Sequence, residues 1–330
     1  MRAISYSRKG PAREVLEIGE MPTPKPGPGE VLVRVSASGV NPSDTKSRSG
    51  WAGVARMPFP RIIPHQDGAG VVEAVGEGVP PHRVGERVWI YEGQWQRPFG
   101  TCAEYIALPA GRAVRLPDAA SFTDGACLGI PVMTAHRCVF ADGPVKDRTV
   151  LVTGGAGAVG HYAVQLAKWG GATVITTVSS DEKAEVARMA RPDHIVNYRT
   201  EDAAARIVAL TGGAGVDRIV EVAFGANLPV AEKVIKTNGT IATYASDAVM
   251  QPVVPFRPFL ARDVTVRFVL VYVMPHEAKE AAIGAITHLL DTGYLRHHVY
   301  REYPMTEVAD AHDAIEHGES LGNVVVRIDS

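Results

Sequence analysis

The chain has 330 residues, of which 46% are hydrophobic and 21% charged, and its formal net charge at pH 7 is −2. This balance is ordinary for a globular protein and excludes the disordered and collagen-like classes. The small net charge argues against nucleic acid as a partner, and no apolar run approaches the roughly 18 residues of a membrane span.

The three cysteines, Cys102, Cys127 and Cys138, are scattered along the chain and odd in number. They can build neither a disulfide framework nor a CxxC metal site. Residues 1–7 lack a basic segment followed by an apolar stretch, so we read no signal peptide there. A cytoplasmic location is therefore the default expectation.

The first third of the chain has the pattern of a β-rich domain. Apolar and polar residues alternate at 31–35, after a stretch rich in proline and glycine, and short apolar runs follow at 69–75 and 87–91. Turn signals that contain glycine separate these runs. We expect a compact, twisted β-domain.

The pattern changes near residue 121. A helix start at 121–125, in which Asp124 would favour the positive end of the helix dipole, precedes a predicted helix at 126–140. Strands are then predicted at 149–153, 173–178, 194–196, 218–222 and 239–244, and helices at 160–169, 181–190, 201–211 and 227–236. This alternation predicts right-handed βαβ units and a parallel sheet covered on both faces. Beyond it we expect a β-rich run at 264–273, helices at 277–291 and 307–316, and a strand at 323–328.

The most informative motif lies at 150–160 and reads VLVTGGAGAVG. It fits the GxGxxG pattern, follows an apolar strand and opens a helix, which is the context of a dinucleotide-binding loop. The glycines allow a tight turn and a close approach of the backbone to a pyrophosphate, which would face the free N–H groups of the helix start. The alternative is a glycine-rich turn without a ligand. We predict that the cofactor phosphates are bound by Gly155, Ala156, Gly157, Val159 and Gly160.

The end of the second strand bears on the choice between NADH and NADPH. An NADH site usually has an acid there, about 20 residues after the glycine motif, and Val178 occupies this position. Ser179, Ser180 and Lys183 follow, and hydroxyls with a cation suit a 2′-phosphate. The acids at 181–182 could still hold the ribose, and Ser179 fits a capping box with the glutamate three residues later, which would make its role structural. We predict NADPH as the cofactor.

Short motifs occur in a fixed order along almost the whole chain. They read GVNPSD at 39–44, IPHQDGAGVVEAVG at 63–76, GERV at 85–88, GTCAEY at 100–105 and GIPVMTA at 129–135, followed by the glycine loop. Together they resemble the medium-chain dehydrogenase/reductase superfamily and, within it, the zeta-crystallin-like quinone reductases.

The resemblance implies an α/β protein with two domains. A GroES-like catalytic domain would comprise residues 1–122 and 264–330, and a Rossmann domain, residues 123–263, would be inserted between its two parts. The change in the sequence pattern near residue 121 agrees with this division. The resemblance also implies an active site in the cleft between the domains.

The zinc-dependent alcohol dehydrogenases of this superfamily bind zinc through Cys and His ligands of the first domain and carry a four-cysteine lobe. Here no cysteine occurs at 39–44, Gln66 takes the position of the His ligand, and the chain has only three cysteines. A catalytic zinc needs about three protein ligands, which the neighbouring His65 cannot supply. We expect no metal and a structural or surface role for His65. Without a Lewis acid, the substrate must accept a hydride readily, as quinones and activated alkenes do.

Three candidate catalytic residues lie in the first domain. Asn41 would donate its amide to a substrate carbonyl, although Asn before Pro42 also suits a turn. Asp44 would orient the site or a water, or serve as a helix N-cap. Trp51 would stack on a flat ring or simply pack. Trp51 and Lys46 stand where the quinone reductases often have tyrosines.

The resemblance adds three residues near the cofactor. Thr134 matches a residue near the nicotinamide, although a β-branched helix residue can also be plain packing. Tyr198 matches a position near the 2′-phosphate, with a surface tyrosine as the alternative. Asn323 stands where the family commonly has the lysine of a Gly-Lys pair, so its contact with the cofactor would be weaker.

The leading functional hypothesis is metal-free, NADPH-dependent reduction of quinones. The second is reduction of an alkenal or enone, or an enoyl reductase, which would use the same cofactor with a different pocket. The third is of another class, namely a weakly catalytic, NADPH-binding structural or RNA-binding protein of the crystallin type. The near-neutral charge argues against strong binding of nucleic acid.

The run at 264–273 also bears on assembly. It is rich in β-branched and aromatic residues and follows the fifth parallel strand, which would place it at or near an edge of the Rossmann sheet. An open apolar edge invites uncontrolled pairing, and twofold pairing with a second copy removes it. We predict a homodimer through this edge; the alternative is an internal strand that needs no partner.

Overall fold

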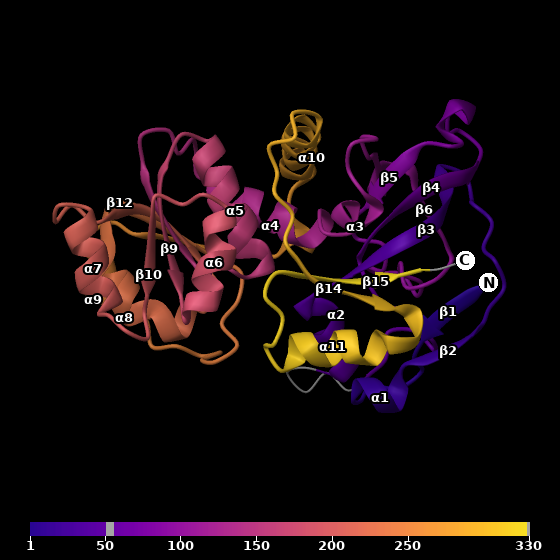
Figure 1. Cartoon of the computed structure of the whole chain (residues 1–330), viewed down its shortest axis with the longest axis horizontal. Coiled ribbons are helices and arrows are strands. Elements are labelled where there is room, and N and C mark those ends of the chain that lie inside the picture. The colour runs from indigo at the N-terminus through magenta and orange to yellow at the C-terminus, as the bar shows by residue number, and fades with distance from the viewer. Residues whose placement is uncertain (51–55, 329–330) are drawn as a thin grey trace. The chain divides into compact units, whose positions relative to one another are not determined.

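The computed structural model describes residues 1–50 and 56–328, which fold into two compact units (Figure 1). The first unit comprises Met1–Ile130 and Ile283–Ser330, and the second comprises Pro131–Ala282. These limits lie after the boundaries expected from the sequence, at 122/123 and 263/264. The predicted site residue Trp51 lies outside the described residues.

The first unit is built on a mostly antiparallel seven-stranded sheet. Its strands are β3 (Glu30–Val40), β4 (Asp67–Val75), β5 (Arg87–Ile90), β6 (Tyr105–Pro109), β7 (Ala113–Arg115), β14 (Val299–Pro304) and β15 (Asn323–Arg327). The order is β14-β15-β3-β4-β5-β7, with β6 also paired to β3. Alternation in β3 turns Val31, Val33 and Val35 into the core, where each is at most 3% exposed. This unit is the β-rich domain that the sequence predicts.

Short elements surround this sheet. Strands β1 (Arg2–Ser5) and β2 (Glu17–Glu20) form a separate antiparallel pair, and the helices are α1 (Ala12–Val15), α2 (Pro42–Ser49), α3 (Phe122–Gly125) and α11 (Val308–Glu316). Helix α11 packs near α1 and α2 (Figure 1). Three-residue 3₁₀ turns occur at Pro81–Arg83, Ala110–Arg112 and Met305–Glu307.

The second unit is a six-stranded, wholly parallel sheet in the order β10-β9-β8-β11-β12-β13. The strands are β8 (Thr149–Thr153), β9 (Thr173–Val178), β10 (His194–Asn197), β11 (Val216–Glu221), β12 (Ile235–Thr243) and β13 (Thr265–Phe268). Helices α5 (Ala158–Trp169), α6 (Asp181–Met189), α7 (Ala203–Leu210), α8 (Phe224–Val234) and α9 (Phe256–Leu260) lie on both sides of this sheet (Figure 1). This confirms the predicted α/β fold with a Rossmann-type parallel sheet.

The two boundaries between the units along the chain each fall within a helix. Helix α4 (Gly129–Phe140) begins three residues later than the predicted 126, because Ser121 and Asp124 form a capping box that starts the separate helix α3. Helix α10 (His276–Asp291) matches the prediction at 277–291 closely. Within the described residues, no helix has the length and apolar character needed to span a membrane.

The predicted strand at 264–273 is wrong in length. Strand β13 ends at Phe268, and the amide of Val269 makes a last hydrogen bond to the Thr243 carbonyl, 2.8 Å away. The chain then enters a 3₁₀ turn, Val271–Val273, which buries Val271 and Tyr272. Since β13 pairs in parallel with β12, it belongs to the sheet of the second unit.

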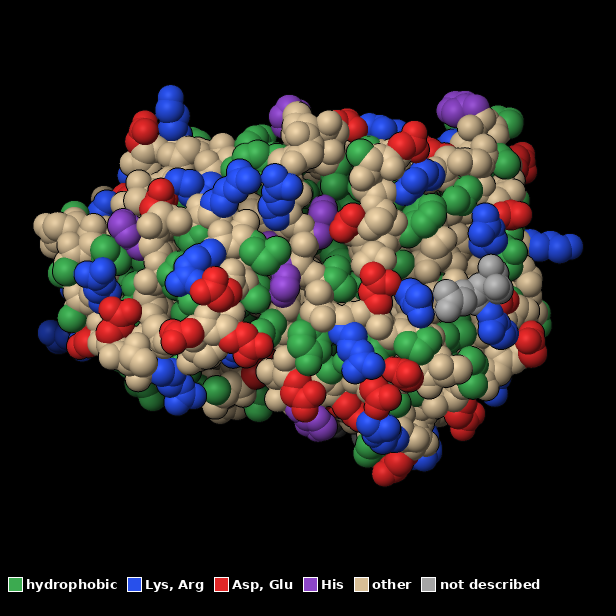
Figure 2. All heavy atoms as spheres, in the orientation of Figure 1, with side chains coloured by type: hydrophobic (Ala, Val, Ile, Leu, Met, Phe, Trp, Pro, Cys, Tyr) green, Lys and Arg blue, Asp and Glu red, His purple; other side chains and the backbone are tan. Residues whose placement is uncertain are grey.

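The surface carries both signs of charge. On the face drawn in Figure 2, basic and acidic side chains are interspersed, which agrees with the formal net charge of −2. Many of these groups form exposed ion pairs, such as Arg115 with Asp291 at 2.7 Å. Such exposed pairs contribute little to stability.

Candidate functional site

Three adjacent parallel strands of the second unit bring the predicted cofactor-binding loops together. In the order β10-β9-β8, each strand ends at the same edge of the sheet. The amide of Gly155, after β8, donates to the Thr177 carbonyl of β9 at 3.2 Å, and the amide of Tyr198, after β10, donates to the Val178 carbonyl at 3.1 Å. The carboxyl edge of such a sheet is where open α/β folds bind ligands.

The glycines of the loop have different reasons to be glycine. A Cβ on Gly155 would lie 2.1 Å from Thr176 Oγ1, and a Cβ on Gly160 would lie 2.2 Å from the Gly154 carbonyl oxygen. Packing therefore requires glycine at both positions. Gly157 differs: it is exposed, it is the N-cap of α5, and the nearest atom to an added Cβ is 3.4 Å away.

The start of α5 fits a pyrophosphate group. The first N–H groups of a helix have no partner within the helix, and the helix dipole favours an anion there. With glycine at 157 the backbone presents no side chain to an approaching phosphate. Of the two residues predicted beside the glycines, Ala156 is buried and Val159 is partly exposed. The geometry of the loop is therefore compatible with the predicted phosphate site.

The start of α6 corrects one prediction. Ser180, not Ser179, is the N-cap, because its Oγ accepts the Lys183 amide at 3.2 Å. The capping box predicted for Ser179 and Glu182 is therefore wrong, and the structural role passes to Ser180. Ser179 and Lys183 are partly exposed. In the part of the chain that the structure describes, the Lys183 ammonium has no ion-pair partner.

Tyr198 and Arg199 follow β10 at the same edge. Tyr198 is 49% exposed, and the Arg199 guanidinium carbon lies 5.9 Å from the centroid of its ring. Arg199 is a second cation beside these strand ends, and sequence reasoning did not assign it a role. Val178, where an NADH site usually has an acid, is 2% exposed and packs in the core, so β9 ends in a buried apolar residue.

A buried carboxylate next to the loop was also missed. Glu221 ends β11, and its Oε1 accepts the Thr153 hydroxyl at 2.9 Å, the Ala223 amide at 2.6 Å and the Asn227 amide at 2.8 Å. Burial raises the pKa of Glu221, while these hydrogen bonds lower it. Glu221 ties the end of β8 to the start of α8 and so braces the strand that carries the glycine loop.

In the first unit, Asn41 and Asp44 lie together at the start of α2. Asn41 is the N-cap and Asp44 is the third helical residue. The backbone N–H of Asn41 donates to Asp44 Oδ2 at 2.8 Å. The predicted alternative of Asp44 as the N-cap itself is therefore wrong. Both side chains are buried, at 4% and 3% exposed. The turn role expected for Asn before Pro42 is present.

Asp67, the first residue of β4, holds the Asn41 side chain. Asn41 Nδ2 donates to Asp67 Oδ2 at 2.8 Å, and the Ile130 amide at the start of α4 donates to the same carboxylate at 2.9 Å. Of the two amide hydrogens of Asn41, one is therefore already committed to Asp67. Asp67 was not a predicted site residue; the signal was a charged residue two positions before the apolar run 69–75.

Burial dominates the electrostatics of these two acids. It raises the pKa of Asp44 to about 7, against hydrogen bonds from Asn41 and from the Gln66 amide that lower it. It also raises the pKa of Asp67 well above its ordinary value, and the neighbouring acids Asp44 and Glu92 add to this rise. A carboxyl of pKa near 7 can hold or release a proton near neutral pH.

The remaining predicted residues lie outside these two groups. Thr134 is on α4 and is 4% exposed. Asn323 begins β15, where Val324 pairs with Val40 of β3, so the sheet brings it beside the segment that leads into Asn41. Its Nδ2 donates to the His298 carbonyl at 3.0 Å.

Gln66, at the position where the zinc enzymes have a His ligand, is hydrogen-bonded to Gln94. Gln66 Nε2 donates to Gln94 Oε1, and Gln66 Oε1 accepts the Gln94 amide, both at 3.1 Å. Across residues 1–50 and 56–328, no three His, Cys, Asp or Glu side chains are grouped as a metal site. His65 is fully buried, so a surface role for it is wrong.

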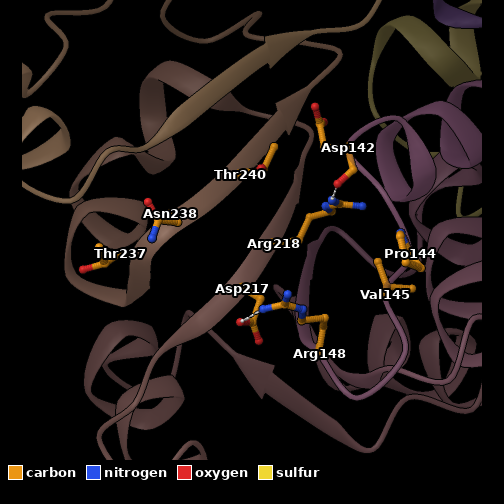
Figure 3. A pocket seen from close by; sticks show the side chains of 9 residues that line it. All are labelled: Asp142, Pro144, Val145, Arg148, Asp217, Arg218, Thr237, Asn238 and Thr240. Carbon is orange, nitrogen blue, oxygen red and sulfur yellow. Dashed lines mark hydrogen bonds and ion pairs between the residues drawn. The ribbon is translucent and has the colours of Figure 1, made fainter.

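A pocket of about 310 Å³ opens at the other end of the parallel sheet (Figure 3). Arg218 donates to the carbonyl oxygens of Asp142 and Gly143, at 2.9 and 3.2 Å, and Arg148 lies 3.3 Å from Asp217. The charged side chains Arg148, Asp217 and Arg218, which line this pocket, are therefore bound to one another or to backbone carbonyl oxygens just after α4. Because ligands of open α/β sheets bind at the carboxyl ends of the strands, we do not assign the cofactor to this pocket.

Comparison with known proteins agrees with both units. Residues 27–118 match the family described as "Alcohol dehydrogenase GroES-like domain", and residues 158–287 match "Zinc-binding dehydrogenase". The human quinone oxidoreductase is 30% identical over 320 residues, 96% of this chain and 94% of that protein. The 2-haloacrylate reductase of a Burkholderia species is 31% identical over 338 residues, 99% of this chain and 98% of that protein.

A solved structure extends the likeness to three dimensions. The Escherichia coli quinone oxidoreductase complexed with NADPH has a TM-score of 0.86 and 25% identity, covering 99% of this chain and all of that one. The order of motifs, the parallel sheet with its glycine loop and the full-length relatives therefore agree. The chain belongs to the medium-chain dehydrogenase/reductase family, in its quinone oxidoreductase branch.

Proposed function

We propose that this protein reduces quinones with NADPH. The observation that carries the proposal is the carboxyl edge of the parallel sheet. The start of α5, the exposed Tyr198 and Lys183, which has no ion-pair partner among the described residues, all follow strands that end at this edge. The solved E. coli relative of the same fold is a quinone oxidoreductase in complex with NADPH, and the human relative is a quinone oxidoreductase. The third hypothesis, a weakly catalytic structural or RNA-binding protein, is set aside because the chain is a medium-chain reductase.

The proposed cofactor residues are those of the glycine loop and of the neighbouring strand ends. The loop Gly155, Ala156, Gly157, Val159 and Gly160 would hold the pyrophosphate, and Ser179, Ser180, Lys183 and Tyr198 would bind the 2′-phosphate. Arg199 adds a second positive charge there. Thr134 and Asn323 are kept as cofactor contacts on the family resemblance alone. When bound, NADPH supplies the hydride.

The substrate side rests on Asn41 and Asp44. One amide hydrogen of Asn41 is bound to Asp67, and the Asn41 side chain also hydrogen-bonds Asp44. In the proposed reaction this second contact is exchanged for one to the substrate oxygen that gains charge. Asp44, whose pKa is raised to about 7 by burial, is protonated in part of the population at neutral pH and steadies Asn41. Trp51 stays a prediction as the ring-stacking residue.

A second candidate reaction is the reduction of an activated alkene. The observation that favours it is the 2-haloacrylate reductase, which is 31% identical over nearly the full length of both chains. A quinone and an alkene conjugated to a carboxyl or carbonyl group both accept a hydride without a metal. The same Asn41 donor would serve either substrate.

The test is a substrate panel read by the loss of NADPH absorbance. The purified protein is mixed with NADPH and an ortho-quinone, a para-quinone, an enal or a 2-haloacrylate, with and without a chelator. We expect the highest kcat/KM with a quinone, and no loss on chelation. Turnover with the enal or haloacrylate alone would favour the second candidate, activity that is lost on chelation and restored by zinc would overturn the metal-free assignment, and inactivity with every acceptor would overturn the function.

We also propose that the protein is a homodimer in the cytoplasm. Strand β13 is the last strand of the parallel sheet, and the segment 249–273 around it exposes several large apolar side chains. The three cysteines are free thiols, as expected in a reducing compartment. Sheet pairing through β13 would cover the open edge.

A further inference from the structure

A continuous row of buried polar side chains crosses the core of the first unit. Ser38 Oγ lies 2.8 Å from His65 Nδ1, and His65 Nε2 lies 2.9 Å from His312 Nε2. The row continues from His312 Nδ1 to Arg48 Nε at 3.4 Å, and from Ser38 through the Thr101 hydroxyl, 2.8 Å away. All five side chains have an exposed fraction of 0%. We call these residues the His65 chain.

Arg48 fixes the direction of every hydrogen bond in the His65 chain. A guanidinium only donates, so His312 Nδ1 accepts and the proton of neutral His312 is on Nε2. His312 therefore donates to His65 Nε2, which leaves the His65 proton on Nδ1, where it is donated to Ser38. Ser38 then donates to Thr101, and Thr101 donates to the Asp67 carbonyl oxygen at 2.6 Å. No donor or acceptor along the row is left in conflict.

The His65 chain also holds an unfavourable backbone conformation. His65 has φ of 79°, in the left-handed region that non-glycine residues rarely adopt. Its ring is held on both nitrogens, and its carbonyl accepts the Thr101 amide at 3.1 Å. Such strain persists only where the surroundings determine it and is common near functional sites. The strained residue stands two positions before Asp67, the residue that holds Asn41.

We propose that His65 and His312 are positioning residues for the Asn41–Asp67 pair. The His65 chain fixes the turn before β4 and the carbonyl of Asp67, which sets the place of the Asp67 carboxylate and, through it, of the Asn41 amide. The proposal depends on the proposed quinone reduction only where kcat is measured. The His65 chain is not a proton conduit, because it ends on a backbone carbonyl that can neither give nor take a proton.

The core would otherwise be expected to be apolar here. Burying polar groups costs free energy even when they are paired, and well-packed apolar replacements are often at least as stable. A fully satisfied polar row, in contrast, specifies one arrangement. The Arg48 end of this row is anchored as well, since Arg48 donates to Glu316 Oε1 at 2.6 Å. Geometric precision at Asp67 is the gain that this arrangement offers.

The test compares His312→Leu, which breaks the row, with His312→Gln, which keeps one donor and one acceptor. Val326→Ala, a fully buried position on β15 in the same core, is the matched control for lost packing. We expect His312→Leu to lower kcat about tenfold, because small misplacements of a site group are costly, with the Kd of NADPH unchanged. His312→Gln should recover most of the loss, and Val326→Ala should lower the melting temperature without lowering kcat.

Two further measurements separate positioning from stability. In the Asn41→Ala background, His312→Leu should have no further effect on kcat; a full additional loss would overturn the proposal. The side-chain NH₂ signal of Asn41 in NMR spectra, which needs no substrate, should shift in His312→Leu and keep its wild-type position in Val326→Ala. An unmoved signal in His312→Leu would overturn the inference even if the wild type proves inactive with quinones, an outcome that would by itself overturn only the proposed function.

Discussion

Ser180 and Lys183 show how a helix cap and a ligand contact can share one helical turn. The Ser180 oxygen accepts the Lys183 amide, which fixes where α6 begins and places the lysine in its first turn. The cap uses the backbone of Lys183 and leaves its side chain available. At a helix N-terminus, where the dipole already favours an anion, this ammonium is suited to a phosphate.

We predict that Lys183→Ala raises the Kd of NADPH about tenfold or more, since a charge-assisted hydrogen bond to phosphate is lost. The Kd of NADH should change little, because NADH lacks the 2′-phosphate. Titration of both cofactors by fluorescence measures this. Lys236→Ala is the control, because Lys236 pairs with Asp217 at the far end of the sheet, and it should leave both Kd values unchanged. Equal losses of NADPH and NADH in Lys183→Ala would contradict the assignment.

The buried histidines predict a dependence of stability on pH. Burial lowers the pKa of His65 from 6.5 to about 3, and it lowers the pKa of His312 well below 6.5, with His65 and Arg48 adding to the shift. Below pH 6.5 the unfolded state therefore binds protons that the folded state does not, so stability is lost as the pH falls toward 3. Between pH 7 and 5 one such histidine accounts for about 2 kcal/mol.

Between pH 7 and 5, the free energy of unfolding should fall in the wild type and fall less in His312→Gln. We expect the two falls to differ by about 2 kcal/mol. Urea unfolding at both pH values measures the difference. Asp44 acts in the opposite sense, because its raised pKa favours the folded state as the pH falls, so only the difference between variant and wild type is diagnostic. Val326→Ala should keep the wild-type pH dependence. An identical dependence in His312→Gln would show that His312 is not held neutral.

At the scale of elements, the glycines of the loop at 154–160 differ in why glycine is needed. Gly155 and Gly160 are required by contacts within the protein. Gly157 has φ of −80°, and an added Cβ there would be no closer than 3.4 Å to any atom. Alanine could adopt that backbone without a clash. Packing therefore does not explain the glycine at 157, whereas the proposed approach of the cofactor phosphates to the start of α5 would.

This contrast predicts two different outcomes for two alanine substitutions. Gly155→Ala should lower the free energy of unfolding by about 1–3 kcal/mol, because its Cβ meets the buried Thr176 hydroxyl. Gly157→Ala should change stability by less than about 1 kcal/mol yet raise the Kd of NADPH at least about tenfold, because the phosphates need close approach of the backbone. Thermal unfolding and cofactor titration give both values. Normal NADPH binding by Gly157→Ala would mean that the phosphates lie elsewhere.

The elements also show which features the sequence could predict. The strands 149–153 and 173–178 match β8 and β9 to the residue, because short apolar runs bounded by turn residues repeat there. The run at 264–273 was predicted too long, since apolar β-branched residues fit a buried 3₁₀ turn as well as a strand. The cap at Ser180 was assigned one residue too early, because two adjacent serines offer the same signal.

The candidate site was predictable only where the motif was local. The glycine loop is one continuous segment, so its spacing revealed it. The contact of Asn41 with Asp67 and that of His65 with His312 join residues that are 26 and 247 positions apart. No periodicity links such pairs in a single sequence. Their hydrogen bonds depend on the order in which β3, β4 and α11 pack.

At the scale of the whole molecule, apolar exposure is concentrated in one segment. Of the 17 exposed large hydrophobic side chains in the described part, nine lie in 249–273, including Val253 at 93%, Phe268 at 74% and Val273 at 66% exposed. Scattered apolar residues on a surface need no explanation, but nine in one segment are what we expect of the proposed dimer contact. Strand β13 adds unpaired backbone groups at the edge of the sheet.

The last prediction concerns this edge. Val269 is 8% exposed, so a charge there would disturb the fold as well as the assembly. Leu270, at 52% exposed, is the better position: Leu270→Glu should leave the melting temperature of the monomer nearly unchanged and place two like charges at a twofold contact. Sedimentation at micromolar concentration should show a wild-type dimer and a monomeric variant. Ile18→Glu, an equally exposed apolar position on β2, should stay dimeric because β2 belongs to another sheet. A wild-type monomer would rule out the dimer. Dissociation by Ile18→Glu but not by Leu270→Glu would place the contact away from β13.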